Sequence, residues 1–253
     1  MVKVALVIFY ATYLTNNREK IGKMWNGFLK PIILVAPIIL ILIGIQSHLS
    51  AAVLMILLVA LMMLMAGSKI RYFLLFGIPG VIAGGSALYV LATKFNIGTY
   101  RLARLTAFID PWADPTDTGW QIIQSLYAIG SGGLFGVGLG NSTQKYLYLP
   151  EPQNDFIFAV IAEELGFIGC VFVIALFAIF VWRGIITAMK APDMFGSLLA
   201  IGITSIIGLQ AMINIAVVTS SMPNTGMQLP FFSYGGTSLL ILLSAVRNII
   251  KYF

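Results

Sequence analysis

Seven runs of apolar residues constrain the fold of this 253-residue chain more than any other feature of its sequence. They cover residues 1–15, 28–45, 49–66, 72–93, 156–182, 197–218 and about 235–250. A helix needs roughly 17–25 residues to cross the hydrocarbon core of a bilayer, a length that all runs but the first approach or exceed. Because 59% of the residues are hydrophobic and only 9% are charged, the chain cannot cover a water-soluble surface. The sequence therefore predicts an all-α, polytopic membrane protein with about seven transmembrane helices.

The composition excludes several other classes of protein. Soluble domains carry roughly 25% charged residues, which rules out a cytosolic enzyme and a disordered tail. The single cysteine, Cys170, leaves no intramolecular disulfide and no thiolate metal cluster. A net charge of +6 would indicate a nucleic-acid partner only if the basic residues shared a solvated face. We expect no such partner, because the basic residues mark membrane sidedness instead.

Most lysines and arginines lie beside alternate ends of the predicted helices, which orients the chain by the positive-inside rule. Those assigned to the cytoplasmic side are Arg18, Lys20, Lys23, Lys30, Lys69, Arg71, Arg183, Lys190, Arg247 and Lys251. The carboxyl terminus is then cytoplasmic, and residues 94–155 form a large extracytoplasmic loop in a single transmembrane domain over 1–253. Residues 120–139 contain two glutamines and many glycines, so we interpret them as a re-entrant or interfacial piece and not as an eighth span.

Acidic residues concentrate in and just after that outer loop. Asp110, Asp114, Asp117, Glu151 and Asp155 lie within it, and Glu163 and Glu164 lie in the following helix. An ionisable group inside a membrane helix costs at least ~2.5 kcal/mol and normally faces a polar interior or a partner. Glu163 and Glu164 therefore either brace a functional site or form a structural hydrogen bond or ion pair between helices. The first three aspartates, which stand among prolines, are expected to shape turns.

Asp155 directly precedes the apolar run that begins at Phe156. An aspartate there is typical of a helix N-cap. A carboxylate at the outer membrane surface is also suited to act as a general base on a lipid-linked substrate. Both interpretations remain open from the residues alone. The only histidine, His48, lies in the polar break at Gln46–Ser50 and is expected to hydrogen-bond locally, because no second histidine accompanies it as a metal ligand.

A series of glycines follows the predicted re-entrant piece. Gly130, Gly132, Gly133, Gly136, Gly138 and Gly140 resemble no phosphate-binding fingerprint, because no strand precedes them and no Gly-Lys-Ser/Thr follows. We expect them to allow tight turning of the backbone beside the membrane.

Three longer stretches carry a family resemblance. They are residues 149–167 (Leu-Pro-Glu-Pro-Gln-Asn-Asp-Phe-Ile-Phe-Ala-Val-Ile-Ala-Glu-Glu-Leu-Gly-Phe), residues 119–133 together with Gly138-Leu-Gly-Asn-Ser-Thr-Gln-Lys145, and residues 224–238 (Asn-Thr-Gly-Met-Gln-Leu-Pro-Phe-Phe-Ser-Tyr-Gly-Gly-Thr-Ser). Together with Lys3, which resembles the lysine of a Glu-x-x-Lys helix, they make the chain resemble the SEDS family of bacterial cell-wall proteins (FtsW, RodA and SpoVE), closest to the FtsW and SpoVE branch. The family has about ten transmembrane helices, so we expect the chain to start inside a longer protein and to lack roughly three helices.

The resemblance implies a peptidoglycan glycosyltransferase of the bacterial cytoplasmic membrane. Such an enzyme polymerises lipid II, a disaccharide-pentapeptide on undecaprenyl pyrophosphate, into glycan strands during cell division or sporulation. It implies a class B penicillin-binding protein and other divisome proteins as partners, and a divalent cation (Mg or Mn) as a candidate cofactor without visible metal ligands. Asp155 is the implied catalytic base. The implied substrate-binding residues are Lys3, Arg101, Gln144, Lys145, Glu151, Ser233 and Tyr234, and the implied structural polar residues are Glu163, Glu164, Gln46 and His48.

Two alternatives to a polymerase remain. A lipid II flippase would use the polar interior, including Glu163 and Glu164, as a passage for the head group. The second alternative is an inactive scaffold protein of the divisome. This alternative applies if the short chain is itself the mature form. A passage requires polar groups through the full membrane thickness, whereas a polymerase requires them at the outer surface, where five of the nine acidic residues are predicted to lie.

Overall fold

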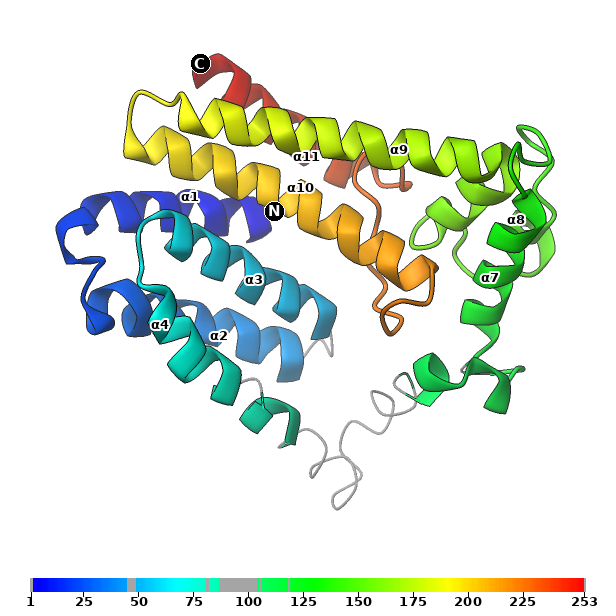
Figure 1. Ribbon diagram of the computed structural model, residues 1–253, viewed down its shortest axis with the longest axis horizontal. Helices are drawn as coiled ribbons and strands as arrows, with labels where there is room; N and C mark the ends of the chain where they lie inside the picture. The colour runs from blue at the N-terminus through cyan, green and yellow to red at the C-terminus, as the bar shows by residue number, and fades with distance from the viewer. Residues whose placement is uncertain are drawn as a thin grey trace. The chain divides into compact units, whose positions relative to one another are not determined.

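The computed structural model describes residues 2–44, 49–80, 82–86, 104, 106–117 and 119–252 (Figure 1). Within these residues the chain is helical and contains no strand. Backbone contacts divide it into two compact units, each described below by itself. The first unit comprises residues 1–75, 176–210 and 235–253, and the second comprises 76–175 and 211–234. The division into units does not test whether the chain forms a single transmembrane domain, so that domain stays a prediction.

Each predicted apolar run is helical where the structure describes it, and residues 81 and 87–93 of the run 72–93 lie outside the described residues. The described α-helices also include one in the predicted re-entrant piece and one at residues 144–147 that the sequence did not predict. They are α1 (Val2–Asn16), α2 (Lys30–Gly44), α3 (Leu49–Met65), α4 (Ile70–Tyr72), α7 (Trp120–Gly132), α8 (Gln144–Leu147), α9 (Ile157–Met189), α10 (Met194–Val218) and α11 (Gly236–Tyr252). Single turns of π-helix, Trp25–Leu29 and Phe73–Gly77, adjoin α2 and α4, and 3-10 turns occur at Arg18–Lys20 and Pro111–Ala113.

Three of these helical segments are long and apolar enough to cross a membrane. They are Trp25–Gly44, α9 and α10. Four shorter apolar helices, Val2–Asn16, Leu49–Met65, Ile70–Ser86 and Gly236–Arg247, coincide with the other predicted runs. The chain is thus a polytopic helical membrane protein. Helix α7 has 13 residues and is about 20 Å long at 1.5 Å per residue, which is short for a span; its re-entrant character stays a prediction.

Close packing in the first unit depends on small residues. A Cβ atom at Gly202 of α10 would lie 2.4 Å from a methyl group of Val7 in α1 and 3.2 Å from the sulfur of Met62 in α3. Helix α1 also contacts α2 through the buried Tyr10 hydroxyl, which donates a hydrogen bond to the carbonyl of Pro31. Buried polar groups need such partners, so this bond fixes the pairing of the first two helices.

The second unit contains a break in α9 at Gly166, whose backbone angles (φ 68°, ψ −167°) are not helical. A break leaves carbonyls before it and amides after it without intrahelical partners. Residues 133–138 supply these partners. The amides of Val137 and Gly138 donate to the carbonyls of Glu163 and Glu164 over 3.0 and 3.1 Å. In return, the amides of Phe167 and Ile168 donate to the carbonyls of Gly133 and Leu134 over 2.9 and 3.3 Å.

Glycines make this backbone pairing possible, which explains the series noted in the sequence. A Cβ at Gly132 would lie 1.9 Å from the carbonyl oxygen of Ala162, and one at Gly136 would lie 2.1 Å from that of Glu164. Gly136 and Gly138 also have positive φ angles, of 78° and 100°. The expected tight turning is therefore present, and its purpose is to pair with the broken helix.

We predict that Gly166→Ala lowers the stability of the second unit by at least ~2 kcal/mol. Alanine at this φ and ψ is strained by roughly 1–3 kcal/mol, and its Cβ would lie 2.4 Å from the amide nitrogen of Gly136. Thermal unfolding in detergent measures the effect. Gly130→Ala in α7 is the matched control, because a Cβ there meets nothing within 4 Å. Equal unfolding midpoints for the two variants would contradict the pairing.

Candidate functional site

Asp155 lies two residues before the first residue of α9 and is half-buried. Among the residues that the structure describes, no backbone amide donates a hydrogen bond to its carboxylate, so the N-cap interpretation is not supported. The backbone of Gly226 lies beside the carboxylate, because a Cβ built there would be 3.3 Å from Oδ2 of Asp155. The side chain therefore lies against the turn at residues 224–234, called the outer turn here because the sequence predicts it on the outer side of the membrane.

The backbone around Asp155 is fixed from three directions. Asn214 of α10 donates through Nδ2 to the carbonyls of Asp155 and Met227, over 2.7 and 2.5 Å. The Ser233 hydroxyl donates to the carbonyl of Asn154. The amide of Tyr234 donates to the carbonyl of Gln153 over 2.9 Å. Residues 153–155 are thereby attached to both α10 and the turn after it.

The start of α7 holds residues 148–150, which precede that segment in the chain. The Trp120 indole donates to the carbonyl of Tyr148 over 2.9 Å, and the Gln121 amide donates to that of Pro150 over 3.4 Å. Gln121 also accepts a 2.5 Å bond from Nδ2 of Asn224. These bonds connect α7, residues 148–155 and the outer turn into one polar assembly.

The surroundings of Asp155 raise the pKa of its carboxyl group. Burial raises the pKa of this carboxyl above its ordinary value, and the negative charge of Glu151 raises it further. The positive charge of Arg104 opposes both effects. Arg104 is held by the outer turn, since its guanidinium donates to the carbonyl of Asn224 over 3.1 Å.

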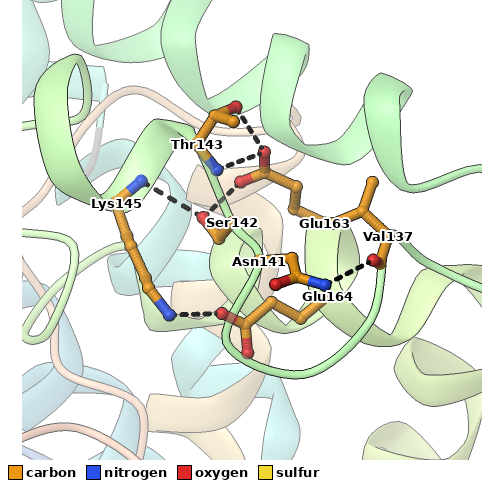
Figure 2. A network of polar contacts seen from close by, with 7 residues as sticks. All are labelled: Val137, Asn141, Ser142, Thr143, Lys145, Glu163 and Glu164. Atoms are coloured by element: carbon orange, nitrogen blue, oxygen red, sulfur yellow. Dashed lines mark hydrogen bonds and ion pairs between the residues drawn. The ribbon is translucent and has the colours of Figure 1, made fainter.

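Glu163 and Glu164 fasten residues 137–145 to the first part of α9, as Figure 2 shows. Glu163 is only 1% exposed and accepts hydrogen bonds from the hydroxyl of Ser142 and from the amide and hydroxyl of Thr143, the latter two over 3.1 and 3.0 Å. Glu164 forms an ion pair of 2.6 Å with Lys145. Both carboxylates therefore have partners within the unit, in the arrangement of a structural brace.

The ion pair affects what Lys145 can do. Its hydrogen bond to Glu164 raises the pKa of the ammonium group, so Lys145 stays charged. An anionic substrate would have to compete with Glu164 for this cation or share it.

The other residues predicted to bind substrate have different surroundings. Gln144 is partly buried in α8, and its Oε1 has no hydrogen-bond partner among the described residues.

The remaining predicted residues are only partly collected around Asp155. Glu151 is exposed, has a φ of 50° and accepts a 2.6 Å bond from Asn154. Ser233 is the anchor described above, and the Tyr234 side chain is 77% exposed. Lys3 is partly buried in α1 of the first unit, so its place in the site stays a prediction. Arg101, Gln46 and His48 lie outside the described residues.

Sequence reasoning missed four residues of this assembly: Arg104, Gln121, Asn214 and Asn224. Arg104 stands three positions after the arginine that was chosen instead. Asn214 is an amide within an apolar run, and such a residue is costly in a membrane helix without a partner. That cost was the available signal.

The described side chains do not form a metal site. Among the described residues, no three His, Cys, Asp or Glu side chains form a group able to hold a metal ion. Among the described residues, Glu151 is the acidic group that acts on Asp155, and two carboxylates do not make a group of three ligands. We therefore derive no step through a metal ion.

The fold is that of a polytopic helical membrane protein, and comparison with known proteins places the chain in a family. A family model for cell cycle proteins of the FtsW, RodA and SpoVE type matches residues 1–251. The chain belongs to this family.

Relatives and solved structures agree with that placement. Stage V sporulation protein E of Bacillus subtilis (strain 168) is 45% identical over 99% of this chain and 67% of its own length. A probable peptidoglycan glycosyltransferase FtsW of Geobacter sp. (strain M18) is 43% identical over 97% of this chain and 65% of its own. The chain thus spans about two thirds of the length of these relatives.

Two solved structures share the fold. One, described as structural coordination of polymerization and crosslinking by a peptidoglycan synthase complex, has a TM-score of 0.78 and 28% identity over 98% of this chain and 66% of its own. The crystal structure of the rod shape determining protein RodA of Thermus thermophilus has a TM-score of 0.61 and 26% identity, over 98% of this chain and 62% of its own.

We predict that Glu163→Ala loosens residues 137–145 and that Glu164→Ala does so less. Removing Glu163 leaves the buried Ser142 hydroxyl and the Thr143 donors without their acceptor, at about 1–3 kcal/mol for each unsatisfied buried group. Removing Glu164 leaves Lys145 without its ion pair, but the Lys145 side chain is 23% exposed and water can solvate it, unlike the buried Ser142 hydroxyl. Hydrogen exchange of the amides of residues 137–145 measures the loosening. Equal protection in the two variants would show that Glu163 is not the main anchor.

Proposed function

We propose that the chain, at the full length of its relatives, is a peptidoglycan glycosyltransferase that polymerises lipid II, with Asp155 as the general base. The observation that carries the proposal is the Asp155 carboxylate, which is half-buried, rigidly mounted and without a hydrogen-bond donor among the described residues. The relative named as a probable peptidoglycan glycosyltransferase supports the reaction class.

The chemistry requires one base and a stabilised leaving group. A sugar hydroxyl of one lipid II molecule attacks the anomeric carbon of another, and its proton passes to the Asp155 carboxylate. The bond from that carbon to the pyrophosphate breaks, and the electron pair leaves with the pyrophosphate. Displacement from the opposite face inverts the anomeric centre. A base whose pKa is raised toward the working pH takes the proton more effectively than an ordinary aspartate.

Cations near the base would stabilise the departing pyrophosphate. Arg104 is the positive charge that acts on Asp155 within the second unit, and Lys145 is a second cation whose charge is secured by Glu164. Lys3 is the third candidate. The engagement of Glu163 and Glu164 with residues 142–145 favours this polymerase over a head-group passage, because both carboxylates already have partners.

The proposed setting is the bacterial cytoplasmic membrane, with Asp155 on the outer side and the carboxyl terminus in the cytoplasm. A class B penicillin-binding protein is the proposed partner, which would cross-link the strands that this protein makes. The similarity to a peptidoglycan synthase complex that coordinates polymerization and crosslinking supports such a partner. Other divisome proteins complete the proposed set.

We predict that Asp155→Asn in the full-length protein abolishes glycan-strand synthesis from lipid II, because an amide cannot accept the proton. For the wild-type protein, the rate falls as the pH drops through the raised pKa of Asp155, so the acid limb of the pH profile lies above that of an ordinary aspartate. Gel analysis of the glycan products measures both. Asp110→Asn is the matched control, because that aspartate only accepts a bond from the Trp112 amide at a 3-10 turn. Normal polymerisation by Asp155→Asn would contradict the assignment of Asp155 as the base. Transport of lipid II across vesicle membranes by the full-length protein, without polymerisation, would favour the flippase.

We predict the sidedness from single cysteines introduced after Cys170→Ala. Lys145→Cys and Gln228→Cys should react with a membrane-impermeant maleimide added outside intact cells, whereas Lys190→Cys should react only after permeabilisation. Lys190 follows α9 and Gln228 follows α10 along the chain, so the two sites report opposite ends of α10. Outside labelling at position 190 would overturn the orientation and the cytoplasmic carboxyl terminus.

A further inference from the structure

We propose that Asn214 is a positioning residue that holds Asp155 in register with the outer turn. The inference rests on the proposed function, because the position of Asp155 matters to a rate only if this carboxylate takes part in the reaction. Asn214 itself contacts no reacting group in this arrangement. It acts through the backbone carbonyls of Asp155 and Met227.

The geometry of the Asn214 amide is unambiguous. Both partners of Nδ2 are backbone carbonyls, which only accept hydrogen bonds, so the NH2 group must point toward them. The two N–H groups of one nitrogen are therefore divided between two chain segments, one carrying the base and one carrying the turn. The side chain is only 1% exposed, so both bonds are buried.

The two carbonyls lie next to the groups that set the environment of the carboxylate. Met227 follows Gly226, whose backbone lies against Oδ2 of Asp155, and Gly226 donates its amide to the side chain of Asn224 over 3.3 Å. Asn224 in turn accepts from Arg104 at its carbonyl. Asn214 thus connects the base to the turn that carries its neighbouring cation.

Other contacts hold the same segment but do not duplicate this connection. Ser233 and Tyr234 hold the carbonyls of Asn154 and Gln153, on the amino-terminal side of Asp155. Only Asn214, among the hydrogen bonds of the described residues, ties the carbonyl of Asp155 itself to the turn at Met227. Its Oδ1 is buried without a hydrogen-bond partner in the described part of the chain. An asparagine kept at that cost indicates that its two donors are what the position requires.

Loss of the two donors should displace the carboxylate without removing it. A displacement of about 1 Å from the productive geometry reduces catalysis by up to 10²-fold. We expect Asn214→Leu, which keeps a similar volume, to lower kcat roughly 10- to 100-fold. The KM for lipid II should change less than about twofold, because Asn214 does not touch the substrate in this arrangement.

The pH dependence separates positioning from a general loss of stability. The charged groups that act on Asp155 are Glu151 and Arg104, and burial is the largest influence on its pKa. A released carboxylate becomes better hydrated, so its raised pKa falls and the acid limb of the kcat profile moves to lower pH. A variant that is only less stable keeps the limb where it is.

A chemical readout judges the proposal independently of activity. Dicyclohexylcarbodiimide reacts with protonated carboxyl groups, so the midpoint of Asp155 modification against pH, measured by mass spectrometry of the full-length protein, reports its protonation. We expect a lower midpoint in Asn214→Leu than in the wild-type protein. Should the leucine variant not fold, Asn214→Ser carries the same test, because a hydroxyl has one donor for two carbonyls.

Ser125→Ala is the matched control. Ser125 is also 1% exposed in the second unit and donates one buried bond, over 2.7 Å, to the carbonyl of Val218. It should reduce stability and leave the modification midpoint unchanged. An unchanged midpoint in both Asn214 variants overturns the proposal, as does a loss of kcat no larger than that of the control.

Failure of the proposed function would look different. In that case Asp155→Asn polymerises lipid II as well as the wild-type protein does, while the carbodiimide midpoint still moves in Asn214→Leu. That pair of results keeps Asn214 as the positioning residue of Asp155 and removes the assignment of the base.

Discussion

Backbone hydrogen bonding across the break in α9 is the constraint on which the second unit depends. Unpaired amides and carbonyls cost several kcal/mol each in a membrane interior, so a helix breaks there only if another segment pairs with the freed groups. Residues 133–138 do so on both sides of Gly166. This pairing brings Ser142, Thr143 and Lys145 to the two glutamates of α9. The position of the whole outer segment therefore follows from one non-helical glycine.

The helices at the seven apolar runs were predictable because a continuous apolar run needs no distant partner to be recognised, whereas the short helix α8 has no such run. Asp155 and the glutamate pair were also identifiable, since carboxylates next to or inside such runs demand an explanation. Asn214 and Gly166 were not singled out, because a single amide or glycine inside an apolar helix has no periodic signature. Their significance depends on the carbonyls of Asp155 and Met227 and on residues 133–138, which are distant in sequence.

The site also shows the limits of choosing cations by sequence alone. Lys145 and Arg101 were the cations predicted from the sequence of residues 94–155, and of these two only Lys145 is among the residues that the structure describes. Lys145 is paired with Glu164, and Arg104 is the cation held on the turn beside Asp155. Composition does not distinguish Arg104 from the other basic residues of the loop, and its hydrogen bond to the carbonyl of Asn224 is visible only in the structure.

Backbone strain is concentrated in the segments that surround Asp155. Three non-glycine residues among the described ones have positive φ, and two of them, Glu151 at 50° and Phe231 at 68°, lie four residues before Asp155 and two before Ser233. A left-handed conformation costs a residue with a side chain roughly 1–2 kcal/mol. Replacing Phe231 with glycine would relieve that cost and yet allow the segment more conformations. The positive φ angles at Glu151 and Phe231 therefore mark the two places where the backbone beside Asp155 is held in a conformation that few residues adopt.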